Sequence, residues 1–173
     1  MLRILSLTIS VVAVIAFIIL ILGYISSPTY TDSISANFDY RPEFIWQEVT
    51  NVRDMERRKS DVESVEVLEQ YGRLTAWKEN LYSGGYRIYR TNEYILNEKW
   101  TIELVESTYE LTGIWTFELK TDGSQTKVTI SEDSQLTDFR RRGVRIIFGR
   151  NKDLLIWMKY IRVGITETLL RTL

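Results

Sequence analysis

The chain has 173 residues, with 22 basic and 23 acidic side chains, and a net charge of −1 at neutral pH. It contains no histidine and no cysteine. These absences exclude an imidazole base, a thiol nucleophile, a disulfide framework and the usual zinc and haem ligands, so no metal and no cofactor is predicted.

An uncharged and largely apolar run opens the chain at residues 4–25. A helix of about 20 apolar residues, rising about 1.5 Å per residue, crosses a hydrocarbon core about 30 Å thick. A cleaved secretory signal has a shorter apolar core, about 7–15 residues, and a small-residue cleavage site that residues 23–27 lack. We therefore predict an uncleaved transmembrane anchor with a short linker over residues 1–31. A cleaved signal is the alternative.

The charges that flank this run predict its orientation. Arg3 and the free amino group precede it, whereas Asp32 and Asp39 follow it before Arg41. Because basic residues near a span tend to stay in the cytoplasm, we predict a cytoplasmic N-terminus and a domain on the outer side. Gly23 without a small-xxx-small partner does not argue for dimerisation, so the oligomeric state stays open.

We predict that residues 32–173 form one domain, which begins with a strand and two short helices. Residues 34–38 alternate between apolar and small polar side chains, as a strand does. Residues 41–43 (Arg-Pro-Glu) open a helix, because proline suits the first helical turn. Residues 52–58 predict a second short helix or turn.

A series of strands follows, with turns at Gly72 and at residues 83–85, 97–98 and 122–124. The predicted strands lie around residues 65–67 and at 74–81, 86–96, 100–106, 113–121 and 126–133. In the clearest of them, apolar and polar residues alternate with a period of two. This pattern predicts an antiparallel sheet with one covered and one solvated face.

After Leu136 the period becomes helical. Residues 139–148 predict a short helix that ends at Gly149, and a long helix runs from Asn151 almost to the end of the chain. Its apolar stripe comprises Leu154, Met158, Ile161 and Ile165, widened by Leu155 and Leu169. A long apolar helix after several strands must bury its stripe, and the covered face of the sheet is the available partner.

The order of these elements and five short segments resemble the START-like (SRPBCC) superfamily, specifically its polyketide cyclase/dehydrase and lipid-transport branch. The segments are Pro42–Trp46, Asp61–Leu68, Trp115–Leu119, Thr126–Asp133 and Phe148-Gly149. The resemblance covers roughly residues 33–170. Arg57 departs from it, because many relatives carry a tryptophan there. The resemblance implies an α+β helix-grip fold, a curved antiparallel sheet around a long C-terminal helix, with an apolar cavity between them and no fixed chemistry.

Four apolar residues are candidates for contact with a ligand in such a cavity. Trp100, Trp115 and Phe117 lie on the apolar faces of their strands, and Met158 lies on the helix stripe opposite. They predict a mostly apolar pocket with few polar groups. The alternative is that these side chains interdigitate and fill the space completely.

Three polar residues are further candidates. Glu132 shares a face with Val128 and Ile130, so its carboxyl could bind a polar ligand end or act as an acid. Arg90 and Tyr94 share a face that could also reach the cavity. The alternatives are ion pairs, between Glu132 and an arginine such as Arg140 or Arg145, and between Arg90 and a neighbouring strand.

The charge distribution is uneven along the chain. Residues 32–137 contain 12 Lys and Arg against 20 Asp and Glu, whereas residues 138–173 contain nine against three. A basic run such as the arginine cluster at 140–142 can indicate binding to nucleic acid or to anionic lipid. No aromatic residues are interleaved with this cluster, so we favour a solvated helix that pairs with the acidic strands, and no nucleic-acid partner is predicted.

The sequence as a whole predicts a membrane-tethered binding or carrier domain for a hydrophobic small molecule such as a lipid or quinone. Two alternatives stay open. One is a cyclase/dehydrase-type enzyme that uses Glu132 or Tyr94 as an acid or base. The other is an envelope domain that binds a partner protein.

Overall fold

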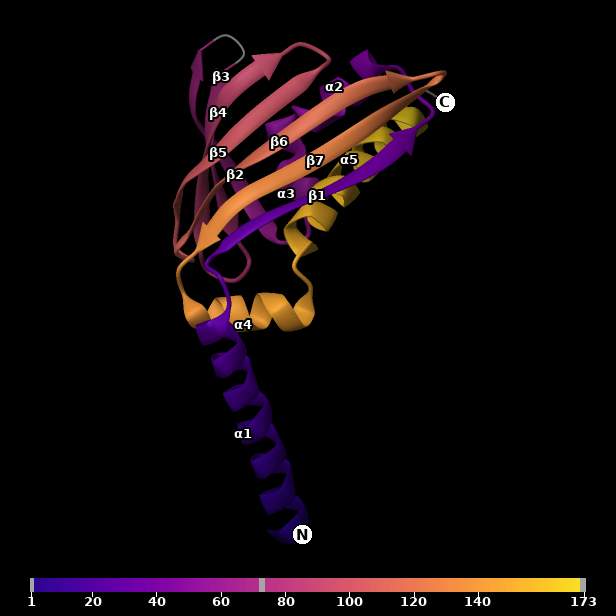
Figure 1. Ribbon diagram of the computed structural model, residues 1–173. Helices are drawn as coiled ribbons and strands as arrows, with labels where there is room; N and C mark the ends of the chain where they lie inside the picture. The colour runs from indigo at the N-terminus through magenta and orange to yellow at the C-terminus, as the bar shows by residue number, and fades with distance from the viewer. Residues whose placement is uncertain (1, 72–73, 172–173) are drawn as a thin grey trace.

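In the computed structural model, which describes residues 2–71 and 74–171, the apolar N-terminal run forms one helix, α1 (Leu2–Ile25). It projects away from the rest of the protein (Figure 1). Among the described residues, one stretch, Thr8–Ile25, is long and apolar enough to cross a membrane, and almost none of it is buried inside the protein. α1 is therefore a candidate membrane span.

The predicted sheet is confirmed. It has seven strands in the order β1-β7-β6-β5-β4-β3-β2, and each neighbouring pair is antiparallel. The strands are β1 (Thr29–Phe38), β2 (Val62–Tyr71), β3 (Leu74–Leu81), β4 (Tyr86–Ile95), β5 (Lys99–Ser107), β6 (Leu111–Asp122) and β7 (Gln125–Leu136). The turn predicted at Gly72 lies outside the described residues.

The first strand is longer than its alternating pattern predicts. It begins at Thr29, which pairs with Gln135 of β7, so part of the expected linker belongs to the sheet. Tyr30 is buried there, and the backbone of Leu136 donates a hydrogen bond to the carbonyl of Pro28. Backbone pairing with β7 extends this strand through residues whose side chains carry no periodic signal.

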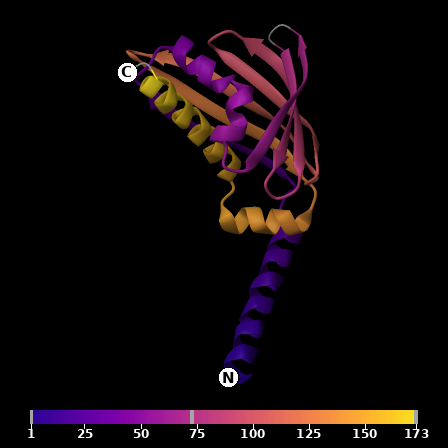
Figure 2. The same cartoon turned by 180° about the vertical axis from the view of Figure 1, so that it is seen from behind.

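The predicted helices all form. Between β1 and β2 lie α2 (Pro42–Val49), a 3₁₀ turn η1 (Val52–Asp54) and α3 (Met55–Arg58), and after β7 come α4 (Phe139–Phe148) and α5 (Lys152–Arg171). The sheet curves around α5, and α2 and α3 lie beside α5 on the same face of the sheet (Figure 2). Arg58 ties these helices together through ion pairs with Glu48 and Glu167. This arrangement is the α+β helix-grip fold.

The stripe of α5 is buried as predicted at Leu154, Met158, Ile161 and Ile165, but the prediction for Leu155 is wrong. Leu155 is 59% exposed, while Trp157 is 3% exposed. The buried arc of the helix is centred on Trp157 and Ile161, and Leu155 lies on the opposite side of that arc.

Aromatic rings fill the space between the sheet and α5. The ring of Trp157 contacts the rings of Phe117 at 5.0 Å, Tyr160 at 5.8 Å, and Tyr89 and Trp100 at 6.4 Å between centroids. Trp77 stacks on Tyr89 and Trp100 from the strand side. The interior of the grip is therefore an aromatic core.

Helix α4 lies across the end of α1 and packs closely against it (Figure 1). Two glycines permit this contact: a Cβ on Gly143 would overlap the carbonyl of Ile19, and one on Gly23 would overlap the carbonyl of Phe139. The Arg142 Nε also donates to the carbonyl oxygen of Gly23 at 3.0 Å. An arginine thus satisfies a carbonyl in the last turn of α1, where the helix dipole favours positive charge.

Candidate functional site

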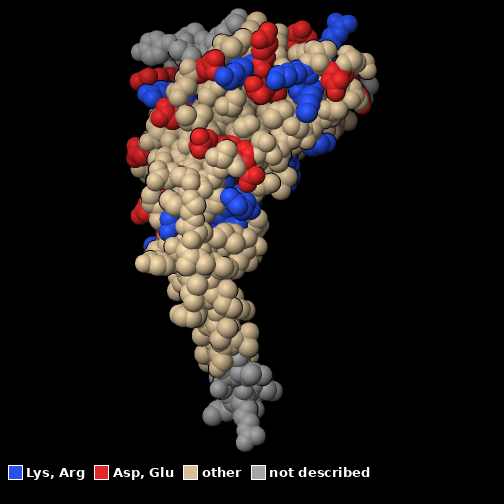
Figure 3. All heavy atoms as spheres, viewed as in Figure 1, with Lys and Arg blue, Asp and Glu red and all other residues tan. Residues whose placement is uncertain are grey.

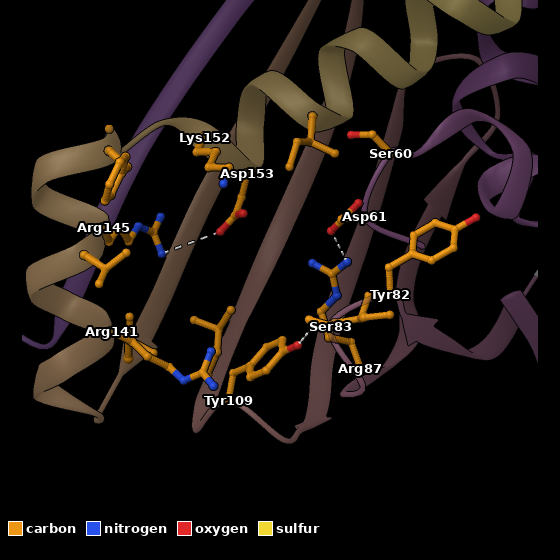
Figure 4. A pocket seen from close by; sticks show the side chains of 17 residues that line it. Ser60, Asp61, Tyr82, Ser83, Arg87, Tyr109, Arg141, Arg145, Lys152 and Asp153 are labelled. Carbon is orange, nitrogen blue, oxygen red and sulfur yellow. Dashed lines mark hydrogen bonds and ion pairs between the residues drawn. The ribbon is translucent and has the colours of Figure 1, made fainter. Parts of the chain in front are cut away.

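A pocket of about 860 Å³ lies between α4, the start of α5 and the β3–β4 hairpin (Figure 4). Ligand pockets in proteins typically have volumes of about 300–1,000 Å³. Its apolar lining consists of Leu81, Leu111, Leu136, Val144, Phe148 and Ile156. This end of the domain is the one next to α1.

Charged side chains face each other across this pocket. Figure 4 shows Arg141 and Arg145 reaching in from α4, and Asp61 and Arg87 on the opposite side. The Arg87 Nη2 lies 2.5 Å from Asp61 and 3.0 Å from the buried Glu79. The pocket therefore combines an apolar lining with paired charges rather than a surface of one sign.

Behind Asp61 and Arg87 lie the buried side chains of Lys59 and Glu79, and these four residues form a buried charge cluster at the edge of the pocket. The Lys59 Nζ is 2.8 Å from Glu79 Oε1 and 4.0 Å from the centroid of the Trp157 ring. Burial lowers the pKa of Lys59, and the charge of Glu79 offsets this effect only in part. Burial favours a higher pKa for Asp61, but the charges of Lys59 and Arg87 outweigh it and lower that pKa.

Three polar atoms near the pocket have no hydrogen-bond partner within the described part of the chain. They are Arg87 Nε, Asp61 Oδ1 and Trp115 Nε1, all of them buried. A buried polar group without a partner costs about 1–3 kcal/mol. Such groups are available to a polar ligand atom or to water.

The cavity that adjoins this pocket on the side of the helix grip is much smaller. A cavity of about 10 Å³ lies beyond Arg87, Leu111, Asp153 and Ile156, and Trp115 is among its lining residues. A water molecule needs roughly 10–15 Å³ of such space. This cavity therefore has room for about one water molecule, and the aromatic core closes it.

Glu132 is held by partners rather than facing an open space. Arg145 of α4 donates to its Oε1 at 2.7 Å, and the hydroxyl of Ser134 donates to the same oxygen. Burial raises the pKa of Glu132, although Arg145 and Ser134 oppose this shift. Of the two interpretations of Glu132, the structure has the ion pair, and Arg145 thereby joins α4 to β7.

The structure separates the seven sequence-predicted site residues. Trp100, Trp115, Phe117 and Met158 are buried between the sheet and α5. Tyr94 accepts a hydrogen bond from Trp46 Nε1 at 2.8 Å. Among these residues and Glu132 and Arg90, only Trp115 lines either of the two cavities, and none lines the larger one. Ligand contact by these residues stays a prediction.

We predicted that Arg90 and Tyr94 share a face of β4 that points toward the cavity, and the structure shows a different inner face. Arg87, Tyr89 and Thr91 are the buried residues, and the Arg90 side chain is 60% exposed and pairs with Glu103 on β5. A register shift between Thr91 and Glu93 breaks the alternation, so Tyr94 no longer follows the face of Arg90. The alternation of Arg87 with Tyr89 is the signal that could have located Arg87.

A known protein family accounts for this architecture. The model of the family described as polyketide cyclase / dehydrase and lipid transport matches residues 38–153. The chain belongs to this family. The match confirms the resemblance inferred from the sequence, and it covers the domain from the end of β1 to the start of α5.

Solved structures of other proteins share the fold of this chain. The Zhui aromatase/cyclase from Streptomyces sp. R1128 is 12% identical, with 84% of this chain and 96% of that chain covered and a TM-score of 0.65. A START superfamily protein from Mycobacterium smegmatis is also 12% identical, with coverages of 80% and 98% and a TM-score of 0.65. Among curated protein sequences, none matches this chain.

Proposed function

We propose that this protein is a membrane-tethered domain that binds a hydrophobic small molecule, such as a lipid or quinone, in the pocket beside α4. The observation that carries the proposal is the pocket itself, about 860 Å³ with apolar walls, at the end of the domain from which α1 projects. Membership of a family described by lipid transport and polyketide cyclisation supports a hydrophobic ligand.

The proposed ligand has an apolar body and a polar end. Leu111, Leu136 and Ile156 provide apolar contacts for the body. Arg87 Nε, which is buried and without a partner in the described part of the chain, is a donor for an oxygen at the polar end. Asp61 holds the guanidinium of Arg87 in place through its ion pair, so the donor is already oriented before a ligand arrives.

In this proposal α1 is an uncleaved anchor. It holds the domain at the bilayer, where hydrophobic ligands reside, and so raises the effective concentration of the domain there. Residues 1–31 then form the anchor and linker and 32–173 the binding domain, although β1 already starts at Thr29. The N-terminus is cytoplasmic and the domain lies on the outer side, because Arg3 precedes the span and Asp32 and Asp39 follow it. The arginines of α4 are too distant in sequence to govern insertion.

Native mass spectrometry of the full chain, released from membranes in mild detergent, tests the proposal, with lipid extraction to identify what is bound. Val144→Trp is the test variant and Val105→Trp is its matched control, because both valines are similarly exposed. Val144 lines the pocket and is 44% exposed, whereas Val105 on β5 is 40% exposed and does not line it. We expect wild type and Val105→Trp to retain a hydrophobic ligand and Val144→Trp to lose it. Equal retention by both variants, or no ligand in wild type, would contradict the proposal.

A further inference from the structure

Helix α4 is fixed at one level of the proposed membrane span. Its Gly143 contacts the backbone of α1 at Ile19, and Arg142 donates to the carbonyl of Gly23. Both views show α4 lying crosswise between α1 and the sheet (Figures 1 and 2). The depth of α4 in a bilayer therefore follows from the depth of α1.

The length of α1 gives that depth. A span that begins at Ile4, directly after Arg3, reaches about 30 Å at its twentieth residue, which is Gly23. Ile19 lies about 6 Å deeper. Because α4 contacts both Ile19 and Gly23, it lies at the boundary between the acyl chains and the lipid headgroups, the depth at which amphipathic helices bury their apolar face by about 5–10 Å.

The two faces of α4 suit this position. Phe139 and Ile147 lie four residues on either side of Gly143, on the face that is turned toward α1, and are 40% and 46% exposed. The opposite face lines the pocket with Arg141, Val144, Arg145 and Phe148. The same short helix thus separates the pocket from the region into which α1 extends.

The charge of α4 identifies the surface that it fits. The helix carries four arginines and no acidic residue, and Arg150 follows it. The side chains of Arg140 and Arg141 are 70% and 48% exposed, and one acidic residue, Asp138 just before the helix, pairs with both of them. Figure 3 shows basic side chains gathered where the uncharged α1 meets the domain. Arginine side chains can bury their stems in apolar surroundings while their guanidinium groups bind phosphates.

We propose that α4 lies in the headgroup layer of an anionic phospholipid bilayer, with Phe139 and Ile147 inserted between the acyl chains and the exposed Arg140 and Arg150 bound to lipid phosphates. This proposal rests on the membrane anchor of the proposed function. It places the pocket directly above the headgroups with only α4 between, so that a hydrophobic ligand passes between bilayer and pocket beside this helix without crossing bulk water.

The chain has no cysteine, so single cysteine substitutions can carry a nitroxide label in the otherwise unchanged full-length protein. We choose Ile147→Cys, with Phe139→Cys as a second site on the same face. The control is Lys120→Cys, which is 76% exposed and lies near the β6–β7 hairpin, at the end of the sheet away from α4 (Figure 1). The protein is placed in nanodiscs of phosphatidylglycerol and phosphatidylcholine. Collision with oxygen and with a water-soluble nickel complex then reports the depth of each label.

We expect the labels at 147 and 139 to be shielded from nickel and accessible to oxygen, and the label at 120 to be accessible to nickel. Water-accessible labels at both α4 sites, in protein that resists extraction by alkali, would overturn the docking of α4 and leave the anchor intact. Extraction of the protein by alkali would instead overturn the anchor, and this inference with it.

The preference for anionic lipid has its own measurement. In mixed nanodiscs, native mass spectrometry gives the ratio of phosphatidylglycerol to phosphatidylcholine retained by the protein. We expect Arg140→Gln/Arg150→Gln to lower this preference, by about fivefold for each arginine removed. The control Arg90→Gln/Lys120→Gln removes two exposed charges away from α4 and should leave the ratio unchanged. An equal effect of both double variants would overturn the assignment of α4 as the anionic-lipid surface.

Discussion

The buried charge cluster behind the pocket predicts an ordering of stabilities. Lys59 and Glu79 are an ion pair at 2.8 Å with side chains 1% and 0% exposed, and Glu79 also lies 3.0 Å from Arg87. Replacing Lys59 by methionine leaves Glu79 with Arg87. Replacing Glu79 by glutamine leaves two buried cations, Lys59 and Arg87, with only Asp61 nearby. We therefore expect Glu79→Gln to destabilise the protein more than Lys59→Met does.

The magnitudes follow from the geometry. At an effective dielectric constant of about 20, two charges 2.8 Å apart attract by about 6 kcal/mol, and desolvation cancels much of this gain. Removing one partner of a buried pair typically costs about 3–5 kcal/mol. We expect Lys59→Met to lower the free energy of unfolding by about 3 kcal/mol, because Arg87 still compensates Glu79, and Glu79→Gln to lower it by about 5 kcal/mol. The double variant should recover about 2 kcal/mol relative to Glu79→Gln, because it no longer buries an unpaired ammonium.

Urea unfolding of the full-length protein in mild detergent, followed by tryptophan fluorescence, measures these differences, since Trp157 lies against Lys59. Two results would refute the reasoning. One is a free energy of unfolding that falls more for Lys59→Met than for Glu79→Gln. The other is a double variant whose loss equals the sum of the single losses.

Three further predictions concern pH, truncation and chemistry. Burial lowers the pKa of Lys59, so the unfolded state binds more protons than the folded state between that lowered pKa and about 10.5. The free energy of unfolding should therefore rise with pH in this window. In urea titrations at a series of pH values, Lys59→Met should flatten this rise. Deletion of residues 1–26 should leave a soluble, folded domain. Deletion of residues 1–31 also removes the buried Tyr30 and should lower the free energy of unfolding by about 3 kcal/mol more. Similar urea midpoints for the two deletions would contradict a stabilising role for the first residues of β1. Glu132→Gln should leave ligand retention in native mass spectra unchanged, since Glu132 does not line the larger pocket and a glutamine oxygen can still accept from Arg145, which also keeps Asp153 at 3.8 Å. A loss of about 10²–10⁴ in the rate of a cyclisation or dehydration would support the enzyme alternative instead.

Local patterns predicted most of the secondary structure. The alternation in β5, β6 and β7 placed Trp100, Trp115 and Ile130 on the covered face, and all three are buried. The pattern failed where tertiary contacts intervene. A register shift in β4 separates Tyr94 from the face of Arg90, and backbone pairing with β7 extends β1 to Thr29.

The site was harder to predict because it is made by distant segments. The sequence shows that residues 139–148 form a helix, but not that this helix lies opposite the β3–β4 hairpin and encloses a pocket with it. Nor does a strand pattern distinguish a lined cavity from a filled one. That outcome depends on how the rings of Trp157, Phe117 and Trp100 pack together, and each ring is apolar in either case.

A crystal structure of the protein carrying its co-purified ligand would test the central claim most directly. We predict ligand density between α4 and the start of α5, in contact with Leu111, Leu136 and Ile156, with the rings around Trp157 in their present positions. Density among Trp100, Trp115 and Met158, with those rings displaced, would contradict the pocket beside α4 and would place the ligand inside the helix grip.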